Sequence, residues 1–301
     1  NPHDRAAGAT HMTTRGIPTT ADELIVTAGG QNALHAILTA TLARGDSLCT
    51  AHFTYPGLLA LARRIGIRLI PIPGDADGLD PDALDTALSR GARAVYLVPT
   101  IDSPTTATLP TERRVAIVAA VRRHGAMLIE DDAYGQLPAA PLPSLSSLMP
   151  ERTWHVASTS KIISPVLRVA HVRAPDRDAA WRLAADVHET AVMAPPLNAA
   201  LVTAWLHDGR FTKLVEAVRA ETIARQRIVS RELNGLDYAT HAEGYHVWLR
   251  LRKTDAVPLL IEAIRPLGLS VVPGEHFAAV PDGPVPAVRL SIGGTLDHER
   301  L

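Results

Sequence analysis

The sequence predicts an α/β protein in which a mostly parallel sheet carries helices on both faces and is followed by a smaller C-terminal α+β domain. Short apolar runs alternate with longer helical patterns from residue 23 to residue 158, which is typical of a helix-covered parallel sheet. After Asp176 helical patterns follow one another directly, and strand patterns return only from Tyr245 onward. We therefore expect a remnant of an N-terminal segment at 1–20, a large α/β domain at 21–208, and a long connecting helix with a small domain at 209–301.

The expected strands are short apolar runs rich in β-branched residues and bounded by turn residues. In chain order they are Leu24–Thr27, Ser47–Thr50, Arg68–Ile72, Ala94–Val98, Met127–Glu130, Trp154–Ala157, Leu167–Val172, Tyr245–Leu251, Leu269–Val272 and Val288–Ile292. The expected helices repeat apolar residues at intervals of three to four, as Val115, Val118 and Ala119 do. They are Gln31–Ala43, Tyr55–Arg64, Pro81–Ser89, Thr111–His124, Arg177–Met193, Leu197–Trp205, about 209–233, and Ala256–Ile264.

Composition excludes several classes of protein. The 301 residues carry 30 basic and 31 acidic side chains, and a formal charge of −1 lacks the basic surplus that binding to nucleic acid requires. No apolar run reaches the roughly 18 to 20 residues of a membrane span. A single cysteine, Cys49, cannot form an internal disulfide. We therefore expect a cytoplasmic protein that binds neither membrane nor, through this chain, nucleic acid.

A glycine-containing turn, Thr27–Gln31, stands where the first strand ends and a helix begins. Glycine lets a backbone approach a ligand closely, and the free N–H groups of a first helical turn attract anions. The turn therefore indicates a phosphate site, and the alternative is an ordinary tight turn. It matches neither the dinucleotide fingerprint nor a P-loop.

Three consecutive carboxylates, Glu130, Asp131 and Asp132, end another expected strand and are followed by Tyr134. Ligand sites of open α/β sheets collect at that edge. The alternative is helix capping by an aspartate. A metal site is not expected, because no cluster of histidine or cysteine supplies further ligands.

The run Ser158-Thr159-Ser160-Lys161 follows the next strand, and Arg168 comes seven residues later. The chain has only three lysines, of which Lys213 and Lys253 are expected on the surface. Lys161 lies among hydroxyls at the sheet edge, where a desolvated amine near a cation has a lowered pKa and can attack a carbonyl to form a Schiff base. The alternative is a solvated surface lysine.

Taken in order, these motifs resemble the fold type I pyridoxal phosphate enzymes, the aspartate aminotransferase superfamily. The pattern is most similar to the aminotransferase-like domain of MocR-type regulators of the GntR group, and the run Pro104–Pro110 and the acidic residues before Tyr134 carry that similarity. The motifs shared with the superfamily are Thr27–Gln31, Thr54–Gly57, Pro99 with Pro104-Thr105, Asp131–Tyr134, Ser158–Lys161 and Arg289–Ser291.

The resemblance implies a role for each site residue. Lys161 would bind pyridoxal 5'-phosphate as a Schiff base and move a proton, Asp131 would pair with the pyridine nitrogen, and Tyr134 would hydrogen-bond the ring hydroxylate. Arg289 would bind the α-carboxylate of an amino acid. Tyr55 would stack on the ring, and the phosphate would be held by Gly30, Gln31, Ser158, Ser160 and Arg168.

One position departs from the family pattern. Most members have asparagine before the Pro-Thr pair to hydrogen-bond the ring hydroxyl, whereas this chain has Ser103, preceded by Asp102. The serine hydroxyl is shorter than an asparagine amide, so we expect Tyr134 to make most of that interaction.

Two functions fit the resemblance. The first is a pyridoxal phosphate-dependent aminotransferase that converts an α-amino acid to a keto acid. The second is a sensing domain of a MocR/GntR-type transcriptional regulator, which binds an amino compound through the same lysine while a separate domain binds DNA. Either would be a homodimer, as is usual in the superfamily.

Overall fold

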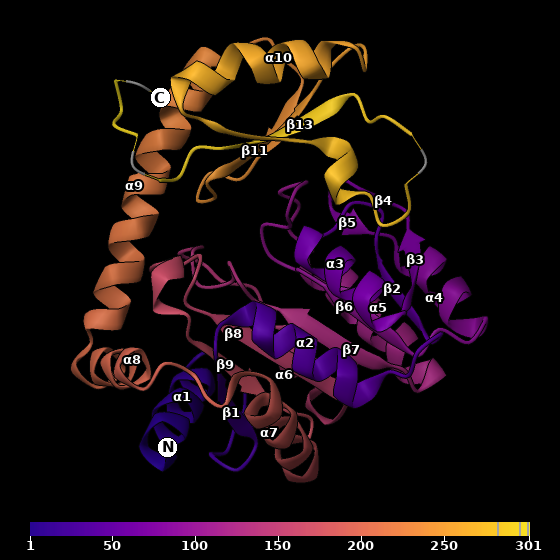
Figure 1. Ribbon diagram of the computed structural model, residues 1–301, viewed down its shortest axis with the longest axis vertical. Helices are drawn as coiled ribbons and strands as arrows, with labels where there is room; N and C mark the ends of the chain where they lie inside the picture. The colour runs from indigo at the N-terminus through magenta and orange to yellow at the C-terminus, as the bar shows by residue number, and fades with distance from the viewer. Residues whose placement is uncertain (282, 295, 300) are drawn as a thin grey trace.

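The computed structural model describes residues 1–281, 283–294, 296–299 and 301. A seven-stranded sheet forms the centre of its larger part, in the order β1-β9-β8-β7-β6-β2-β3 (Figure 1). Neighbouring strands from β3 to β8 are parallel, and only β9 and β1 run antiparallel to their neighbours. The predicted mostly parallel sheet is thus confirmed. Its strands are β1 (Leu24–Thr27), β2 (Ser47–Ala51), β3 (Arg68–Ile72), β6 (Ala94–Leu97), β7 (Met127–Asp131), β8 (Thr153–Ser158) and β9 (Ala170–Arg173).

Helices cover both faces of this sheet, as predicted. Since alternate residues of a strand point to opposite faces, each strand contributes side chains to two separate cores. Ala94 and Tyr96 of β6 belong to one core with the helices on their face, and Val95 and Leu97 belong to the other. The first core is covered by α2 (Gly30–Thr41), α3 (Pro56–Ile65), α7 (Arg177–Ala191) and α8 (Pro196–Asp208). The second is covered by α4 (Pro81–Ser89), α5 (Thr111–His124) and the short α6 (Leu145–Leu148).

The smaller C-terminal α+β part is also confirmed. A long helix, α9 (Arg210–Glu232), runs from the large sheet to a four-stranded antiparallel sheet of order β10-β11-β13-β12 (Figure 1). Helix α10 (Ala256–Ile264) lies over this sheet (Figure 1). The strands are β10 (Tyr238–Thr240), β11 (His246–Arg250), β12 (Ser270–Pro273) and β13 (Ala287–Ser291).

The structure adds elements that the sequence patterns did not predict. The largest is α1 (Pro2–Thr14), which packs against β1 and α8. Gly8 lets this helix approach β9 closely, since a Cβ at position 8 would lie 2.6 Å from the ring of His171 on that strand. The others are the short helix α6, strand β10, the hairpin β4 (Gly74–Asp75) with β5 (Gly78–Leu79), and the short 3-10 helices Pro150–Arg152, Pro165–Leu167, Arg265–Leu267 and Gly274–Phe277.

The expected strand Leu167–Val172 was partly wrong. Residues 165–167 form a 3-10 helix after Ser164, and Arg168 has a left-handed backbone with φ of 50°. Such a backbone cannot continue an extended strand. The strand β9 therefore begins only at Ala170.

Within the described residues, no helix is long and apolar enough to cross a membrane.

A buried arginine fixes the loop that follows β6. Arg114 of α5 is only 1% exposed, and its guanidinium donates hydrogen bonds to the carbonyl oxygens of Leu109, Pro143 and Pro99 at 2.8 to 3.0 Å. A further bond of 2.9 Å reaches the hydroxyl of Thr100. Arg114 thus holds both ends of the loop from residue 99 to residue 109, which carries Ser103.

We expect Arg114→Met to lower the free energy of unfolding by about 3 kcal/mol or more, because it leaves several buried carbonyl groups without donors. Urea denaturation measures the loss. The matched control is Arg123→Ala on the same helix, where an exposed ion pair with Asp85 should contribute much less to stability. Equal losses in the two variants would contradict this prediction.

Candidate functional site

All residues that the sequence analysis assigned to a site line one cavity at the carboxyl ends of the parallel strands. The cavity has a volume of about 150 Å³. Three residues that the analysis did not name, Val98, Ala133 and Pro165, complete its walls. The assigned residues in the lining are Gly30, Gln31, Tyr55, Ser103, Asp131, Tyr134, Ser158, Ser160, Lys161, Arg168 and Arg289.

One corner of the cavity has the donors of an anion site. Helix α2 begins after Gly29, whose φ of 83° is in the left-handed region that favours glycine. A Cβ at Gly29 would also lie 2.9 Å from the guanidinium of Arg168, which donates to the carbonyl of Ala28 at 3.2 Å. Opposite lie Ser158 and Ser160, whose hydroxyls are 2.9 Å apart. A helix N-terminus, two hydroxyls and an arginine together form a corner suited to a phosphate group.

The three carboxylates at the end of β7 have three different environments. Glu130 accepts hydrogen bonds from the backbone N–H groups of Leu145 and Ser146 at 2.9 and 2.8 Å, and thereby caps α6. Asp132 forms an ion pair of 2.6 Å with Arg15. Only Asp131 lines the cavity. The capping alternative therefore holds for Glu130, while Asp131 is the member available to a ligand.

A buried histidine connects the two outer carboxylates. Nδ1 of His155 lies 2.9 Å from Glu130, and Nε2 lies 3.4 Å from Asp132. Burial alone would lower the pKa of His155, but the two carboxylates together raise it to about 9. For Asp132, burial opposes ionisation, yet Arg15 and His155 hold its pKa below the ordinary value. Arg15, Asp132, His155 and Glu130 therefore form a row of side chains whose charges alternate in sign.

Asp131 receives a hydrogen bond of 2.7 Å from the hydroxyl of Tyr96, which is fully buried in β6. Burial raises the pKa of Asp131 to about 6, with the charge of Asp132 adding to the shift and Tyr96 and Lys161 opposing it. Tyr96 has no local sequence signal that marks it as a site residue, because it lies inside an apolar strand 35 residues before Asp131.

Lys161 is half-buried in the turn after β8, whereas Lys213 and Lys253 are exposed. Burial lowers the pKa of Lys161, and the nearby charge of Arg289 lowers it further, while Asp131 acts in the opposite direction. Among the described residues no hydrogen bond or ion pair holds its amine. An amine with these surroundings is unprotonated more readily than a surface lysine, which favours nucleophilic or basic chemistry.

Tyr134 meets a partner that the sequence analysis missed. Its hydroxyl lies 3.0 Å from Nε2 of His246 on β11, and the ring of Tyr245 packs nearby at a centroid distance of 5.8 Å. Burial lowers the pKa of His246 well below its ordinary value, so the ring is neutral. The two residues are separated by 112 positions in the chain, and no local pattern connects them.

Arg289 of β13 reaches the cavity from the small sheet. It donates a hydrogen bond of 3.0 Å to the hydroxyl of Ser103, and its guanidinium lies 4.8 Å above the ring centre of Phe277. Its Nε is buried without a hydrogen-bond partner in the described part of the chain. No carboxylate of the described residues pairs with it, so it can bind a carboxylate from outside.

A larger cavity of about 590 Å³ adjoins the first and shares Ser160, Lys161 and Pro165 with it. Its far wall is formed by α9, including Leu214 and Val218. Lys161 thus lies between the anion corner of the first cavity and this larger cavity.

The parallel sheet, the anion corner and the lysine at the strand ends define a class of cofactor-binding α/β protein, and comparison with known proteins identifies the family. The chain belongs to the family of class I and II aminotransferases, whose family model matches residues 5–301.

Its relatives include both regulators and enzymes. An uncharacterized HTH-type transcriptional regulator of Bacillus subtilis, YdeF, is 31% identical over 95% of this chain. A 2-aminoadipate transaminase of Thermus thermophilus is 32% identical over 93% of it. The chain spans 62% of the length of the first and 72% of the second.

A solved structure shares the fold closely. The α-aminoadipate aminotransferase LysN of Thermus thermophilus, in complex with N-(5'-phosphopyridoxyl)-L-leucine, superposes with a TM-score of 0.87 at 28% identity. The match covers 98% of this chain and 77% of LysN.

We expect the stability that His155 contributes to depend on pH. Its pKa of about 9 in the folded chain exceeds the ordinary 6.5, so the contribution is complete below pH 6.5 and is lost as the pH rises through 9. The difference in unfolding free energy between the wild type and His155→Gln should therefore shrink by about 3 kcal/mol between pH 6 and pH 10. Denaturant titrations at both pH values measure it, and a difference that stays constant would contradict the prediction.

Proposed function

We propose that the chain is a pyridoxal phosphate-dependent aminotransferase acting on an α-amino acid. The observation that carries this proposal is that Lys161, Asp131, Arg289 and the anion corner line one cavity. The family and the aminotransferases among its relatives support it.

The residues present fit the cofactor. The corner at α2, Ser158, Ser160 and Arg168 has the N–H, hydroxyl and guanidinium donors that a phosphate needs. Across the cavity, the carboxylate of Asp131 can pair with a protonated ring nitrogen. When bound, pyridoxal phosphate supplies a carbonyl carbon that reacts with amines and a ring that accepts electrons.

In this proposal Lys161 holds the cofactor through its Nζ and, once released, carries a proton to and from the substrate. Its lowered pKa supports both roles, because an unprotonated amine is a nucleophile and a base. Asp131, kept ionised by the hydrogen bond from Tyr96, would hold a proton on the ring nitrogen. Arg289 would bind the α-carboxylate of the amino acid with two parallel hydrogen bonds.

The remaining residues would orient the ring. Tyr55 would stack on its face, and Tyr134 would hydrogen-bond its hydroxylate while His246 holds the tyrosine in place. Ser103 would contribute through its hydroxyl, which now contacts Arg289.

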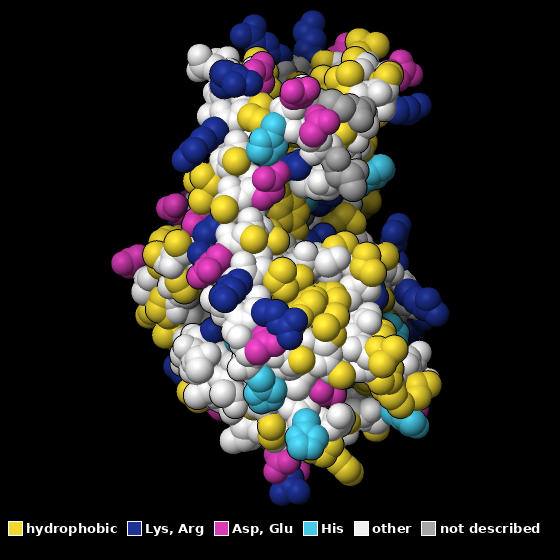
Figure 2. All heavy atoms as spheres, turned by 90° about the vertical axis from the view of Figure 1, so that its left-hand side faces the viewer, with side chains coloured by type: hydrophobic (Ala, Val, Ile, Leu, Met, Phe, Trp, Pro, Cys, Tyr) yellow, Lys and Arg dark blue, Asp and Glu magenta, His cyan; other side chains and the backbone are white. Residues whose placement is uncertain are grey.

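We further propose that residues 21–208 act as the cofactor-binding domain and that residues 209–301 close over the substrate. A homodimer is supported by exposed apolar side chains on the large part of the chain, of which Val166, Trp181 and Leu197 are 79%, 78% and 86% exposed. Hydrophobic side chains also gather on the face where α8 lies (Figure 2). The one cysteine, Cys49, is buried and free, which supports a cytoplasmic location.

A second candidate is the sensing domain of a MocR/GntR-type regulator, which would bind an amino compound without turnover. It is favoured by the regulators among the relatives: the chain matches 62% of YdeF and 55% of the HTH-type regulator TauR of Rhodobacter capsulatus. In that case a domain outside these 301 residues would bind DNA.

We expect the purified chain with pyridoxal phosphate to absorb visible light and to retain the cofactor covalently on Lys161 after borohydride reduction. Peptide mass spectrometry locates the bond, and Lys161→Ala should abolish both signals. The matched control, Lys213→Ala, should change neither, because Lys213 is exposed on α9. Recovery of the cofactor on Lys213 or Lys253 would overturn the assignment.

Turnover separates the two candidates. An aminotransferase should produce keto acid over many cycles at about 1 per second or faster with a suitable amino acid pair. A sensor should show the spectral change on amino acid addition but no sustained keto acid release. Coupled assays across the common amino acids measure both, and sustained release would exclude the sensing role.

A further inference from the structure

A second cavity of about 340 Å³ lies beside the cofactor pocket, at the ends of β2, β3 and β6. The hairpin of β4 and β5 and the turn at residues 102–109 complete its walls. It shares only Val98 with the lining of the first cavity. Its volume lies within the range that small-molecule sites have, about 300 to 1,000 Å³.

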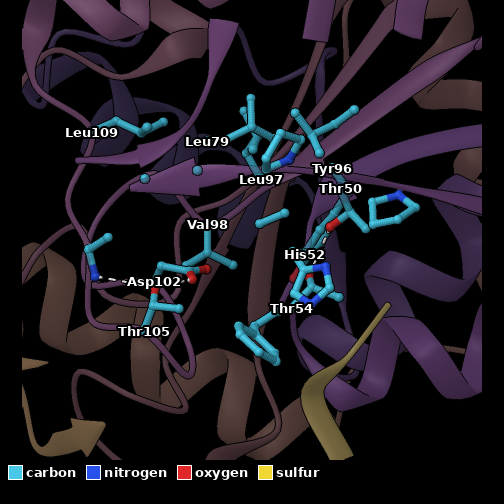
Figure 3. Close-up of a pocket in the computed structure, with 18 of the residues that line it drawn as sticks. Thr50, His52, Thr54, Leu79, Tyr96, Leu97, Val98, Asp102, Thr105 and Leu109 are labelled. Atoms are coloured by element: carbon cyan, nitrogen blue, oxygen red, sulfur yellow. Dashed lines mark hydrogen bonds between the residues drawn. The ribbon is translucent and has the colours of Figure 1, made fainter. Parts of the chain in front are cut away.

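The walls of this cavity combine apolar side chains with one carboxylate. Leu79, Leu97 and Leu109 form an apolar side, and Asp102 with Thr105 lies across the cavity from Thr50 and His52 (Figure 3). Proline and isoleucine side chains of β3 add further apolar surface. The lining therefore suits a ligand with an apolar body and one polar end.

The carboxylate of Asp102 has no cationic partner. The hydroxyl of Thr105 donates to its Oδ2 at 2.7 Å, but no ion pair of the described residues includes it, and no lysine or arginine lines the cavity. The other lining carboxylate, Asp75, is already paired with Arg113 at 2.5 Å. Burial, only partly offset by the bond from Thr105, raises the pKa of Asp102 to about 7. A cation placed in the cavity would remove this penalty.

The turn that carries Asp102 is held in place by its own backbone. The N–H of Asp102 donates to the carbonyl of Ala107 at 2.8 Å, and the N–H of Thr106 donates back to the carbonyl of Asp102 at 2.7 Å. The position of the carboxylate is therefore set before any ligand arrives, which lowers the entropic cost of binding.

We propose that this cavity is a second ligand site that binds a small organic cation, an ammonium or amidinium with an apolar body, through Asp102. The cationic N–H donates to the carboxylate, and the apolar body lies against Leu79, Leu97 and Leu109. A divalent metal ion is a poor fit, because it would need several oxygen ligands where the walls are largely apolar.

The site adjoins the cofactor pocket through two residues. Tyr96 lines the second cavity and donates its hydroxyl to Asp131 of the first, and Asp102 immediately precedes Ser103. A primary amine would also react at the cofactor, so the probe must be unable to do so. N,N-dimethylbenzylamine is a tertiary amine that cannot form a Schiff base, and benzyl alcohol is its neutral counterpart.

The test is isothermal titration calorimetry of the purified chain, both with and without added pyridoxal phosphate. Wild type should bind N,N-dimethylbenzylamine with a dissociation constant below about 1 mM and at least about tenfold more tightly than benzyl alcohol. Asp102→Asn should bind the amine about tenfold more weakly and leave the affinity for the alcohol unchanged. The matched control, Asp75→Asn, should bind the amine like wild type, because that carboxylate is already paired.

A second variant, Ala107→Phe, narrows the cavity and keeps the carboxylate. It should weaken the binding of both the amine and the alcohol. It replaces Asp102→Asn in the test if circular dichroism shows that Asp102→Asn does not fold. The proposal does not rest on the proposed function, since the same titrations in Lys161→Ala should give the same affinities. Equal amine affinity in wild type and Asp102→Asn, or no binding up to about 10 mM, would overturn it.

Discussion

The buried row of charges formed by Arg15, Asp132, His155 and Glu130 is the constraint on which the candidate site depends. Three adjacent carboxylates cannot remain ionised inside a protein without compensation. Here the outer two are neutralised by a histidine, an arginine and the N-terminus of α6, so that Asp131 alone faces the cavity. The row also joins α1, β7, β8 and α6, and it therefore ties the position of Asp131 to the packing of the large sheet.

The electrostatics of the cavity are set by three groups that are each displaced from their ordinary state. Lys161 and Arg289 have lowered pKa values mainly because they are buried, and Asp131 has a raised one for the same reason. Burial thus disfavours the charged form of each of these three groups. An anionic ligand with a protonatable ring would restore these charges together, which gives a physical reason for binding the whole cofactor at once.

Much of the fold and of the candidate site could be predicted from the sequence. Strands such as Leu24–Thr27 and Arg68–Ile72 and helices such as Thr111–His124 have the predicted bounds, because their apolar periodicity is local. Most of the site residues could be grouped because they end or follow strands of the large sheet, and parallel strands end at one edge. Arg289 is different, because it lies within β13 of the small sheet. What could not be predicted depends on distant contacts: the bond from Tyr96 to Asp131, the bond between Tyr134 and His246, and the packing of α1 through small residues without a strong apolar stripe.

The hydrogen bond between Arg289 and Ser103 connects the two sheets across the cavity. Arg289 belongs to the small sheet and Ser103 to a loop that follows β6 of the large sheet. The bond therefore joins the two parts of the chain at the cavity. The bond to Ser103 uses only one N–H of the guanidinium, and Nε has no partner among the described residues, so a carboxylate can bind the remaining donors while the connection to Ser103 persists. A ligand that lacks a carboxylate offers no acceptor of this kind to Arg289, so the large and small sheets then remain connected through Ser103 alone at this point.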